Sequence, residues 1–135
     1  MVNLLRISEA ASLAMHTMVL LAKDPEKVVS THTIATTLGV SEAHLSKVLQ
    51  RLARAGLVRS VRGPAGGFSP GKPCDELALL EVYEAIEGPL TDRTCLFARP
   101  VCDGKACILG DLLGEVNQQV KDCLGSAKLS KLARQ

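Results

Sequence analysis

Three cysteines stand close together in the second half of the chain. Cys95 and Cys102 are separated by six residues, and Cys102 and Cys107 by four, in a stretch where Pro100 and Gly104 favour turns. Thiolates are the usual ligands of iron-sulfur clusters, and three of them from one loop leave a further ligand to come from elsewhere. The spacing matches neither a ferredoxin run nor a zinc site built from Cys-x-x-Cys pairs. The pattern therefore indicates metal or redox chemistry and leaves its kind open.

The other two cysteines and the start of the chain bear on the compartment. No basic and apolar leader with a cleavage site opens the sequence, and polar residues interrupt the apolar run from Ile7 to Leu21. We therefore expect a cytoplasmic protein that does not enter a membrane. In a reducing compartment, five cysteines are not expected to form a disulfide framework. Cys74 and Cys123 lie outside the loop, and we interpret them as structural or incidental thiols.

The composition predicts the kind of fold that must position the loop. Apolar residues make up 47% of the 135 residues, with one Tyr, two Phe and no Trp, so the core should be aliphatic and mainly helical. Residues 1–73 hold nine Lys and Arg against four Asp and Glu, whereas residues 74–135 hold seven against ten. A basic half beside an acidic half suits a nucleic-acid-binding module joined to another unit, although such charge is common on protein surfaces.

The first half of the chain is typical of a helix-turn-helix. Each predicted helix has a capping residue in front and a breaking residue behind: Ser8 to Asp24, Ser30 or Thr31 to Gly39, and Ser41 to Gly56. Apolar residues recur at helical spacing in the third helix, at Leu45, Val48, Leu49 and Leu52. The second and third helices, joined by a tight turn that contains glycine, form the motif.

The third helix also carries a basic stripe turned away from its leucines. Lys47, Arg51 and Arg54 stand at positions i, i+4 and i+7. These cations could lie along DNA phosphates while the first turns, with His44 and Ser46, reach the base edges. A solvated helix surface is the alternative explanation for the stripe taken alone.

Residues 57–69 are typical of a β wing. Two short apolar segments flank Gly63-Pro64-Ala65-Gly66-Gly67, which predicts strand, turn and strand. Arg62 stands at the mouth of this turn, and the glycines, beginning with Gly63, would let the backbone approach a duplex so that the arginine enters a narrow minor groove. A phosphate-binding loop is disfavoured, because no Lys-Ser/Thr pair follows the glycines and no helix begins after them.

These motifs together resemble the IscR, NsrR and CymR family of bacterial winged-helix regulators, the Rrf family. The resemblance is carried by LSKVLQRL at residues 45–52, AGLV at 55–58, VRGPAGGF at 61–68 and LLEVYEAIEG at 79–88, and it covers almost the whole chain. It implies a mainly α fold with a small β wing, in which a winged helix-turn-helix is joined to a long dimerisation helix. It also implies a homodimer that binds double-stranded DNA at a palindromic operator and represses transcription, without being an enzyme.

The resemblance assigns DNA contacts to Ala43, His44, Ser46 and Lys47 on the recognition helix and to Arg62 in the wing. With the basic stripe and the first wing glycine, the predicted contacts are Ala43, His44, Ser46, Lys47, Arg51, Arg54, Arg62 and Gly63. Ser46 stands where one branch of the family has a glutamate that reads a cytosine. The operator of that branch therefore does not transfer to this chain.

The resemblance also implies that Cys95, Cys102 and Cys107 bind a 2Fe-2S or 4Fe-4S cluster. Some members use a histidine shortly after the third cysteine as the fourth ligand, but none follows Cys107 here. Other members draw a carboxylate from the first helix of the opposite subunit, and Glu9 occupies the matching position. The alternative for Glu9 is a carboxylate favoured at a helix N-terminus by the helix dipole. Loss or oxidation of the cluster would then change how the two DNA-binding heads are set apart.

We expect three regions along the chain. Residues 1–73 form the winged helix-turn-helix, residues 74–106 a linking helix and the cysteine loop, and residues 107–135 a dimerisation helix and a short last helix. From Cys107 onward, apolar residues recur at helical steps: Ile108, Leu109, Leu112, Leu113, Val116 and Val120. Ser126 is the predicted cap of the last short helix.

Two other functions stay open on the sequence. The first is a regulator of the same fold without a cluster, controlled by a cysteine thiol switch or by a partner protein. The second is a small iron-sulfur electron carrier, which would need the cluster but not the basic helix and wing. No Ser/His/Asp grouping, paired carboxylate site or nucleotide-binding loop supports catalysis.

Overall fold

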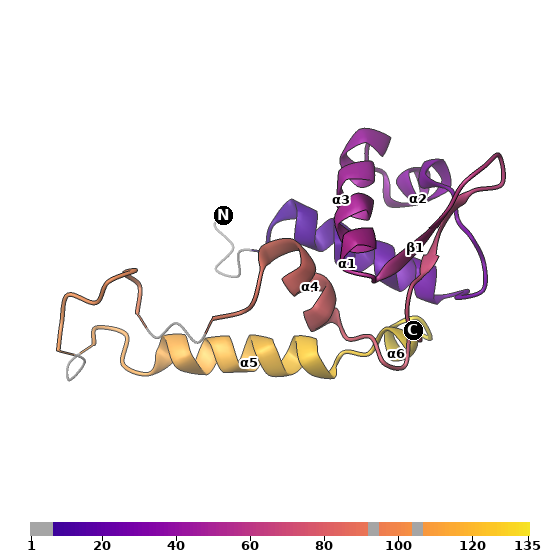
Figure 1. The fold of residues 1–135 in the computed structure, drawn as a ribbon. Coiled ribbons are helices and arrows are strands. Elements are labelled where there is room, and N and C mark those ends of the chain that lie inside the picture. Colours follow the sequence, from indigo (N-terminus) through magenta and orange to yellow (C-terminus); the bar gives the residue numbers. More distant parts are fainter. Residues whose placement is uncertain (1–6, 92–94, 104–106) are drawn as a thin grey trace.

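The fold is known from a computed structural model, which describes residues 7–91, 95–103 and 107–135. The elements follow in the order α1 (Glu9–Ala22), α2 (Thr31–Leu38), α3 (Glu42–Arg54), β1 (Val58–Val61), β2 (Gly67–Pro70), α4 (Leu79–Glu87), α5 (Leu112–Ser126) and α6 (Leu129–Leu132). In Figure 1, α1, α2, α3 and the two strands form a head, and α4 lies between this head and the long helix α5. The mainly α fold with a small wing is confirmed.

The three helices of the head begin at the predicted caps. The hydroxyl groups of Ser8, Ser30 and Ser41 accept hydrogen bonds from the backbone N–H groups of Ala11, Thr33 and His44, respectively. Gly39 ends α2 with a φ of 68°, a left-handed conformation that costs glycine little. The chain therefore turns tightly from α2 into α3, as a helix-turn-helix requires.

The wing is a two-stranded antiparallel sheet in which Val61 pairs with Gly67. The next residue, Phe68, exchanges backbone hydrogen bonds of 2.8 and 2.9 Å with Val29, so the wing is attached to the segment before α2. Gly67 has a φ of 156°, and a Cβ at this position would lie 2.2 Å from the carbonyl oxygen of Val29. Only glycine fits this close approach of two backbones.

The core is aliphatic, as the composition predicts. Met18 of α1, Leu49 of α3 and Val82 of α4 are all inaccessible to solvent. Leu129 of α6 is equally buried, and its N–H donates to the carbonyl of Leu77 at 2.9 Å. The last helix therefore returns to the head and completes the core.

Two boundaries differ from the predicted ones. The helix expected from Cys107 begins only at Leu112, because Gly110 takes a left-handed φ of 57° in a turn that its N–H closes on the carbonyl of Cys107. Ser126 does not cap the last helix. It is the last residue of α5, its hydroxyl donates to the carbonyl of Asp122 at 2.8 Å, and α6 begins after Lys128.

Candidate nucleic-acid interface and cysteine loop

The recognition helix α3 buries its leucines and leaves its basic stripe outside. Leu45, Val48, Leu49 and Leu52 are buried. The predicted contact residues Ala43, Lys47, Arg51 and Arg54 are exposed, and His44 and Ser46 are partly buried. Hydrophobic packing thus fixes the rotation of α3 so that Lys47 and Arg54 face solvent, where phosphates could approach.

The wing carries the other two predicted DNA contacts. Arg62 and Gly63 are exposed in the turn between β1 and β2. Gly63 has a φ of 108°, and a Cβ added to it would meet no described atom within 4 Å. In Figure 1 the wing loop extends outward beside α2. The wing turn is therefore open for a backbone approach.

Arg51 differs from the other cations of the stripe. Its guanidinium donates a hydrogen bond to the carbonyl of Ile86, in the last turn of α4 and 35 positions away in the sequence. In the same turn, Glu87 accepts a hydrogen bond from the hydroxyl of Ser8, the cap of α1. The end of α4 is thus tied to both α3 and α1. No local sequence signal predicted either contact.

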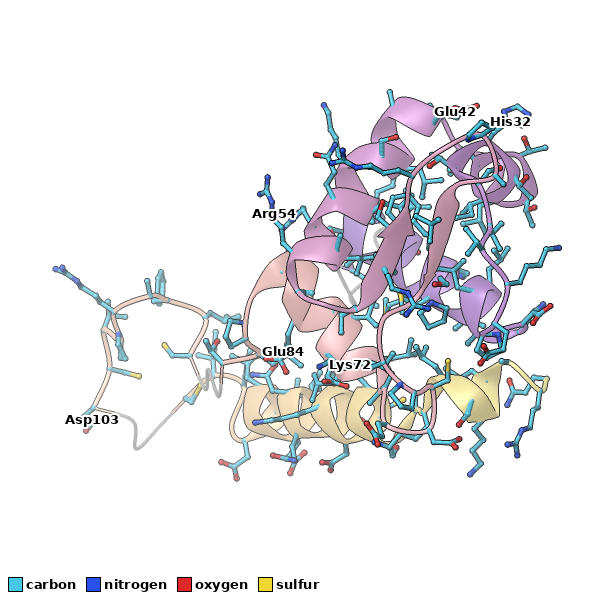
Figure 2. The ribbon with its side chains drawn as sticks, turned by 45° about the vertical axis from the view of Figure 1, so that its right-hand side comes forward. His32, Glu42, Arg54, Lys72, Glu84 and Asp103 are labelled. Carbon is cyan, nitrogen blue, oxygen red and sulfur yellow. The ribbon has the colours of Figure 1, made fainter. Side chains whose placement is uncertain are left out.

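A second contact that the sequence did not predict lies at the opposite end of α3. Nδ1 of His32, in α2, is 2.6 Å from Oε1 of Glu42, the first residue of α3. Figure 2 shows the two labelled side chains together at the end of α3 that is far from α5. The available signal was the position of Glu42 directly after the cap residue Ser41.

The three loop cysteines line one cavity. Cys95 is partly buried, Cys102 and Cys107 are exposed, and all three border a cavity of about 150 Å³. Its other lining residues are apolar: Leu96, Phe97, Val101 and Ile108. Three thiols against an apolar wall are the donor set and surroundings that an iron-sulfur cluster uses. The residues present therefore fit such a cofactor in their chemistry.

The thiols are not gathered into a ligand set, however. Within residues 7–91, 95–103 and 107–135, no three His, Cys, Asp or Glu side chains are grouped so that they could hold a metal ion. Residues 92–94 and 104–106, which directly precede Cys95 and Cys107, lie outside the described part of the chain. The loop shares one cavity among its thiols without presenting a finished metal centre.

Glu9, the predicted fourth ligand, lies in the first turn of α1 and is exposed. It lines a separate cavity of about 250 Å³, together with Ser12 and His16 of the same helix. Within one chain, Glu9 does not border the cysteine cavity. Its role as a ligand supplied by the opposite subunit stays a prediction.

The remaining two cysteines have contrasting surroundings. Cys74 is buried, and its burial, together with the nearby carboxylate of Asp75, raises the pKa of its thiol. Cys123 is exposed on α5. Neither borders the cavity of the loop cysteines, which agrees with their interpretation as structural or incidental thiols.

Most of the apolar stripe of the long helix α5 is not buried by the rest of its own chain. Leu124 is its one buried residue in the described chain, whereas Leu112 and Val116 are exposed. In Figure 1, α5 extends from beneath the head to the cysteine loop. The part of α5 nearest the loop therefore carries apolar surface that its own chain leaves open to solvent. None of the described helices is both long and apolar enough to cross a membrane.

A family model described as Rrf2, iron-dependent transcriptional regulator, matches residues 7–135 of this chain. The HTH-type transcriptional regulator IscR of Erwinia tasmaniensis is 30% identical to it over 99 residues, which are 73% of this chain and 60% of that protein. The chain thus spans 60% of the length of this relative.

Solved structures confirm the winged-helix fold over nearly the whole chain. CymR, the global cysteine regulator of B. subtilis, is 30% identical, with a TM-score of 0.82 that covers 97% of this chain and 98% of that one. The oxidized form of Staphylococcus aureus CymR is 25% identical, with a TM-score of 0.80 and the same coverage.

Proposed function

Because the chain belongs to the Rrf2 family of transcriptional regulators, we propose that it is a homodimeric repressor whose operator binding is controlled by its cysteine loop. Like its relatives, it is a DNA-binding regulator of transcription, and it is not an enzyme. Membership of this family argues against the small electron carrier. A cytoplasmic location is part of the proposal, because a regulator acts where the chromosome lies.

The head would bind DNA through two elements. Lys47 and Arg54 of α3 would contact phosphates, which adds salt-dependent affinity without reading sequence. Ala43, His44 and Ser46, in the first turns of the helix, would lie against base edges in the major groove. Arg62, with Gly63 beside it, would enter the flanking minor groove.

One observation carries the control by the loop: Cys95, Cys102 and Cys107 line a common apolar cavity. These three residues would hold an iron-sulfur cluster, with Glu9 of the partner subunit as the fourth ligand. When bound, the cluster would supply a centre whose oxidation state or integrity responds to oxidants, nitric oxide or cluster supply. The description of the family as iron-dependent supports this proposal.

The contacts at the end of α4 offer a route from the loop to DNA. The chain leaves α4 at Glu87 and enters the loop a few residues later. Arg51 binds Ile86 and Ser8 binds Glu87, so a change in the loop that moves this turn would act directly on α3 and α1. A rearranged α3 would alter the fit to the operator.

A homodimer is supported by the open apolar surface of α5. Exposed Leu112 and Val116 would be buried if α5 packed against the same helix of a second copy. A twofold pairing places the same surface on both sides of the interface and gives two heads for a palindromic operator.

A cluster-free thiol switch is the second candidate function. Its support is that the described cysteines are not gathered into a ligand set and that CymR, including an oxidized form, is among the similar structures. In this alternative, oxidation would join two loop thiols or modify one of them, and the same route through α4 would reach α3.

The decisive experiment combines spectroscopy with DNA binding. Protein purified without oxygen is examined by visible absorption and EPR, and iron and acid-labile sulfide are assayed on the same sample. Operator affinity is then measured before and after oxidation. Cys102→Ser is compared with Cys123→Ser, a matched exposed cysteine outside the loop. The cluster proposal expects colour and sulfide in the wild type and in Cys123→Ser, and their loss in Cys102→Ser.

Other outcomes separate the alternatives. The thiol switch is supported if the wild-type protein is colourless, fails cluster reconstitution and changes its DNA affinity on oxidation. The DNA affinity of Cys102→Ser should then not change on oxidation. A DNA affinity that is identical in all states of the loop would contradict control by the loop and leave DNA binding intact.

A further inference from the structure

The recognition helix begins with a carboxylate. Glu42 is the first residue of α3, directly after the cap Ser41, and 55% of its side chain is exposed. It is one of only four acidic residues in residues 1–73, which hold nine basic ones. The N-terminal residues of the second helix of a helix-turn-helix are those that contact base edges. Glu42 therefore lies where the major groove would come closest.

In a DNA complex, a carboxylate in this position is unfavourable unless the DNA donates a hydrogen bond to it. DNA phosphates repel it, and the first turn of α3 already has a side-chain acceptor in Ser41. An ionised carboxylate has two oxygens and only accepts. Its affinity cost in a DNA complex is offset where a base presents a donor to it.

His32 holds Glu42 in one orientation. Nδ1 of His32 lies 2.6 Å from Oε1 of Glu42, and Nδ1 must be the donor because the carboxylate only accepts. Among residues 7–91, 95–103 and 107–135, only His32 bonds to this carboxylate, so Oε2 keeps its capacity to accept. Both side chains are largely exposed, and an exposed pair contributes little to folding stability. Orientation of the carboxylate is the effect that this contact can have.

The base edges discriminate among possible partners of Oε2. In the major groove, guanine presents two acceptors and thymine an acceptor and a methyl group, and adenine has an acceptor beside its amino group. Cytosine presents its N4 amino group as a donor, and a carboxylate is its matching partner. A fixed carboxylate thus favours cytosine and is repelled by the acceptors of the other bases.

We propose that Glu42 reads one cytosine in each operator half-site by accepting a hydrogen bond from its N4 amino group, and that His32 is the positioning residue for this contact. The inference rests on α3 entering the major groove, as in the proposed function. Neither residue belongs to the DNA contacts that the sequence predicted.

The test measures base preference at each position. The wild-type protein first selects its operator from a random duplex pool, and every single base substitution of that operator is then measured by fluorescence anisotropy. For Glu42→Ala we expect affinity for the operator to fall about tenfold, with the loss of discrimination confined to one C·G pair per half-site. Affinity for unrelated DNA should rise, because a negative charge has been removed.

Two variants sharpen this expectation. Glu42→Gln has nearly the same shape but an amide that matches the N6 and N7 atoms of adenine, so the preference at that position should move from cytosine toward adenine. Glu26→Ala removes the same charge from an exposed site of the head outside α3 and should change no base preference.

His32 is tested by its effect on the same base pair. His32→Ala should weaken discrimination at that C·G pair a few-fold and leave the other positions unchanged. His32→Asn, whose amide nitrogen can take the place of Nδ1, should restore it. Circular dichroism of each variant checks that α3 is folded.

The proposal is overturned if Glu42→Ala changes affinity for all sequences by one common factor, since Glu42 would then act only through its charge or the helix dipole. A wild-type protein that selects no sequence would instead contradict the proposed function. The two failures are therefore distinguishable.

Discussion

The head buries its apolar residues, whereas the cysteine loop exposes them. In the head, Leu49 is fully buried between helices, whereas Val101 and Ile108 in the loop are 81% and 90% exposed. Burial of apolar surface is the main stabilising contribution to a fold, so the head carries its own stability. The loop does not, and its arrangement must depend on what covers or binds it. This is the division expected if the head binds DNA rigidly and the loop is the proposed sensor.

The end of α4 links the two regions along the chain. Ile86 and Glu87, at the end of α4, contact Arg51 and Ser8 of the head, and the chain continues from there toward Cys95. A hydrogen bond to Arg51 is directional, so it can respond to a shift that nonspecific packing would absorb. The contrast between the regions can therefore be tested through each of them and through this junction.

The largest expected effect comes from truncating the core of the head. Leu49→Ala should lower the free energy of unfolding by about 2–5 kcal/mol, because it leaves a cavity between α3 and its neighbours. Ile108→Ala in the loop should change it by less than about 0.5 kcal/mol. Urea unfolding followed by circular dichroism, at one protein concentration for all variants, measures both. Equal losses would mean that the loop is packed like the core.

The junction should show the next largest effect. In the wild type, the operator affinities of the reduced and oxidised states should differ by a factor of about 5–150, which is common for coupled sites. Arg51→Ala should bring this ratio close to one. Arg54→Ala, an exposed arginine on the same helix, should weaken both states equally and keep the ratio. Fluorescence anisotropy on reduced and oxidised protein gives the four affinities. If Arg51→Ala behaves like Arg54→Ala, Arg51 is a phosphate contact and not a link to α4.

A smaller effect is expected from one phosphate contact of the head. Lys47→Ala should reduce the slope of log affinity against log salt concentration by about 1.8, since the proposed homodimer loses two copies of Lys47 and two fewer counterions are released. Lys131→Ala removes an exposed lysine from α6, at the C-terminal end of the chain, and should leave the slope unchanged. A salt titration of binding to a fixed duplex distinguishes them. An unchanged slope in Lys47→Ala would remove this residue from the interface.

The smallest effect concerns Cys74. Its raised pKa means that the folded state keeps the thiol proton to a higher pH than the unfolded state, whose thiol has a pKa near 9.0. The associated stability is therefore complete below that value and is lost as pH rises through the folded pKa. At pH 8, alkylation of cluster-free, reduced protein followed by mass spectrometry should modify Cys102 and Cys123 first and Cys74 last. Early modification of Cys74 would show that its surroundings open readily.

The sequence alone determined the parts of the molecule that depend on near neighbours. A serine cap acts on a backbone N–H three residues away, and Gly39 supplies a left-handed turn at its own position, so the helices of the head were predictable. The wing was predictable for the same reason, because its turn depends on glycines that are adjacent in the sequence. The identity and spacing of the three cysteines were also visible, as were the cations Lys47 and Arg62.

Only the tertiary structure decided how distant segments meet. Arg51 bonds to Ile86, His32 bonds to Glu42, and α6 returns to the core. The sequence does not identify the two partners of any of these contacts, although the place of Glu42 directly after the cap Ser41 was visible. The structure was also needed to find that α5 begins at Leu112. The apolar residues recur at helical spacing from Ile108 onward, but the left-handed turn at Gly110 delays the start of the helix. Hydrophobic periodicity records which side of a helix is buried, but the partner of that side is set by the packing of the whole chain.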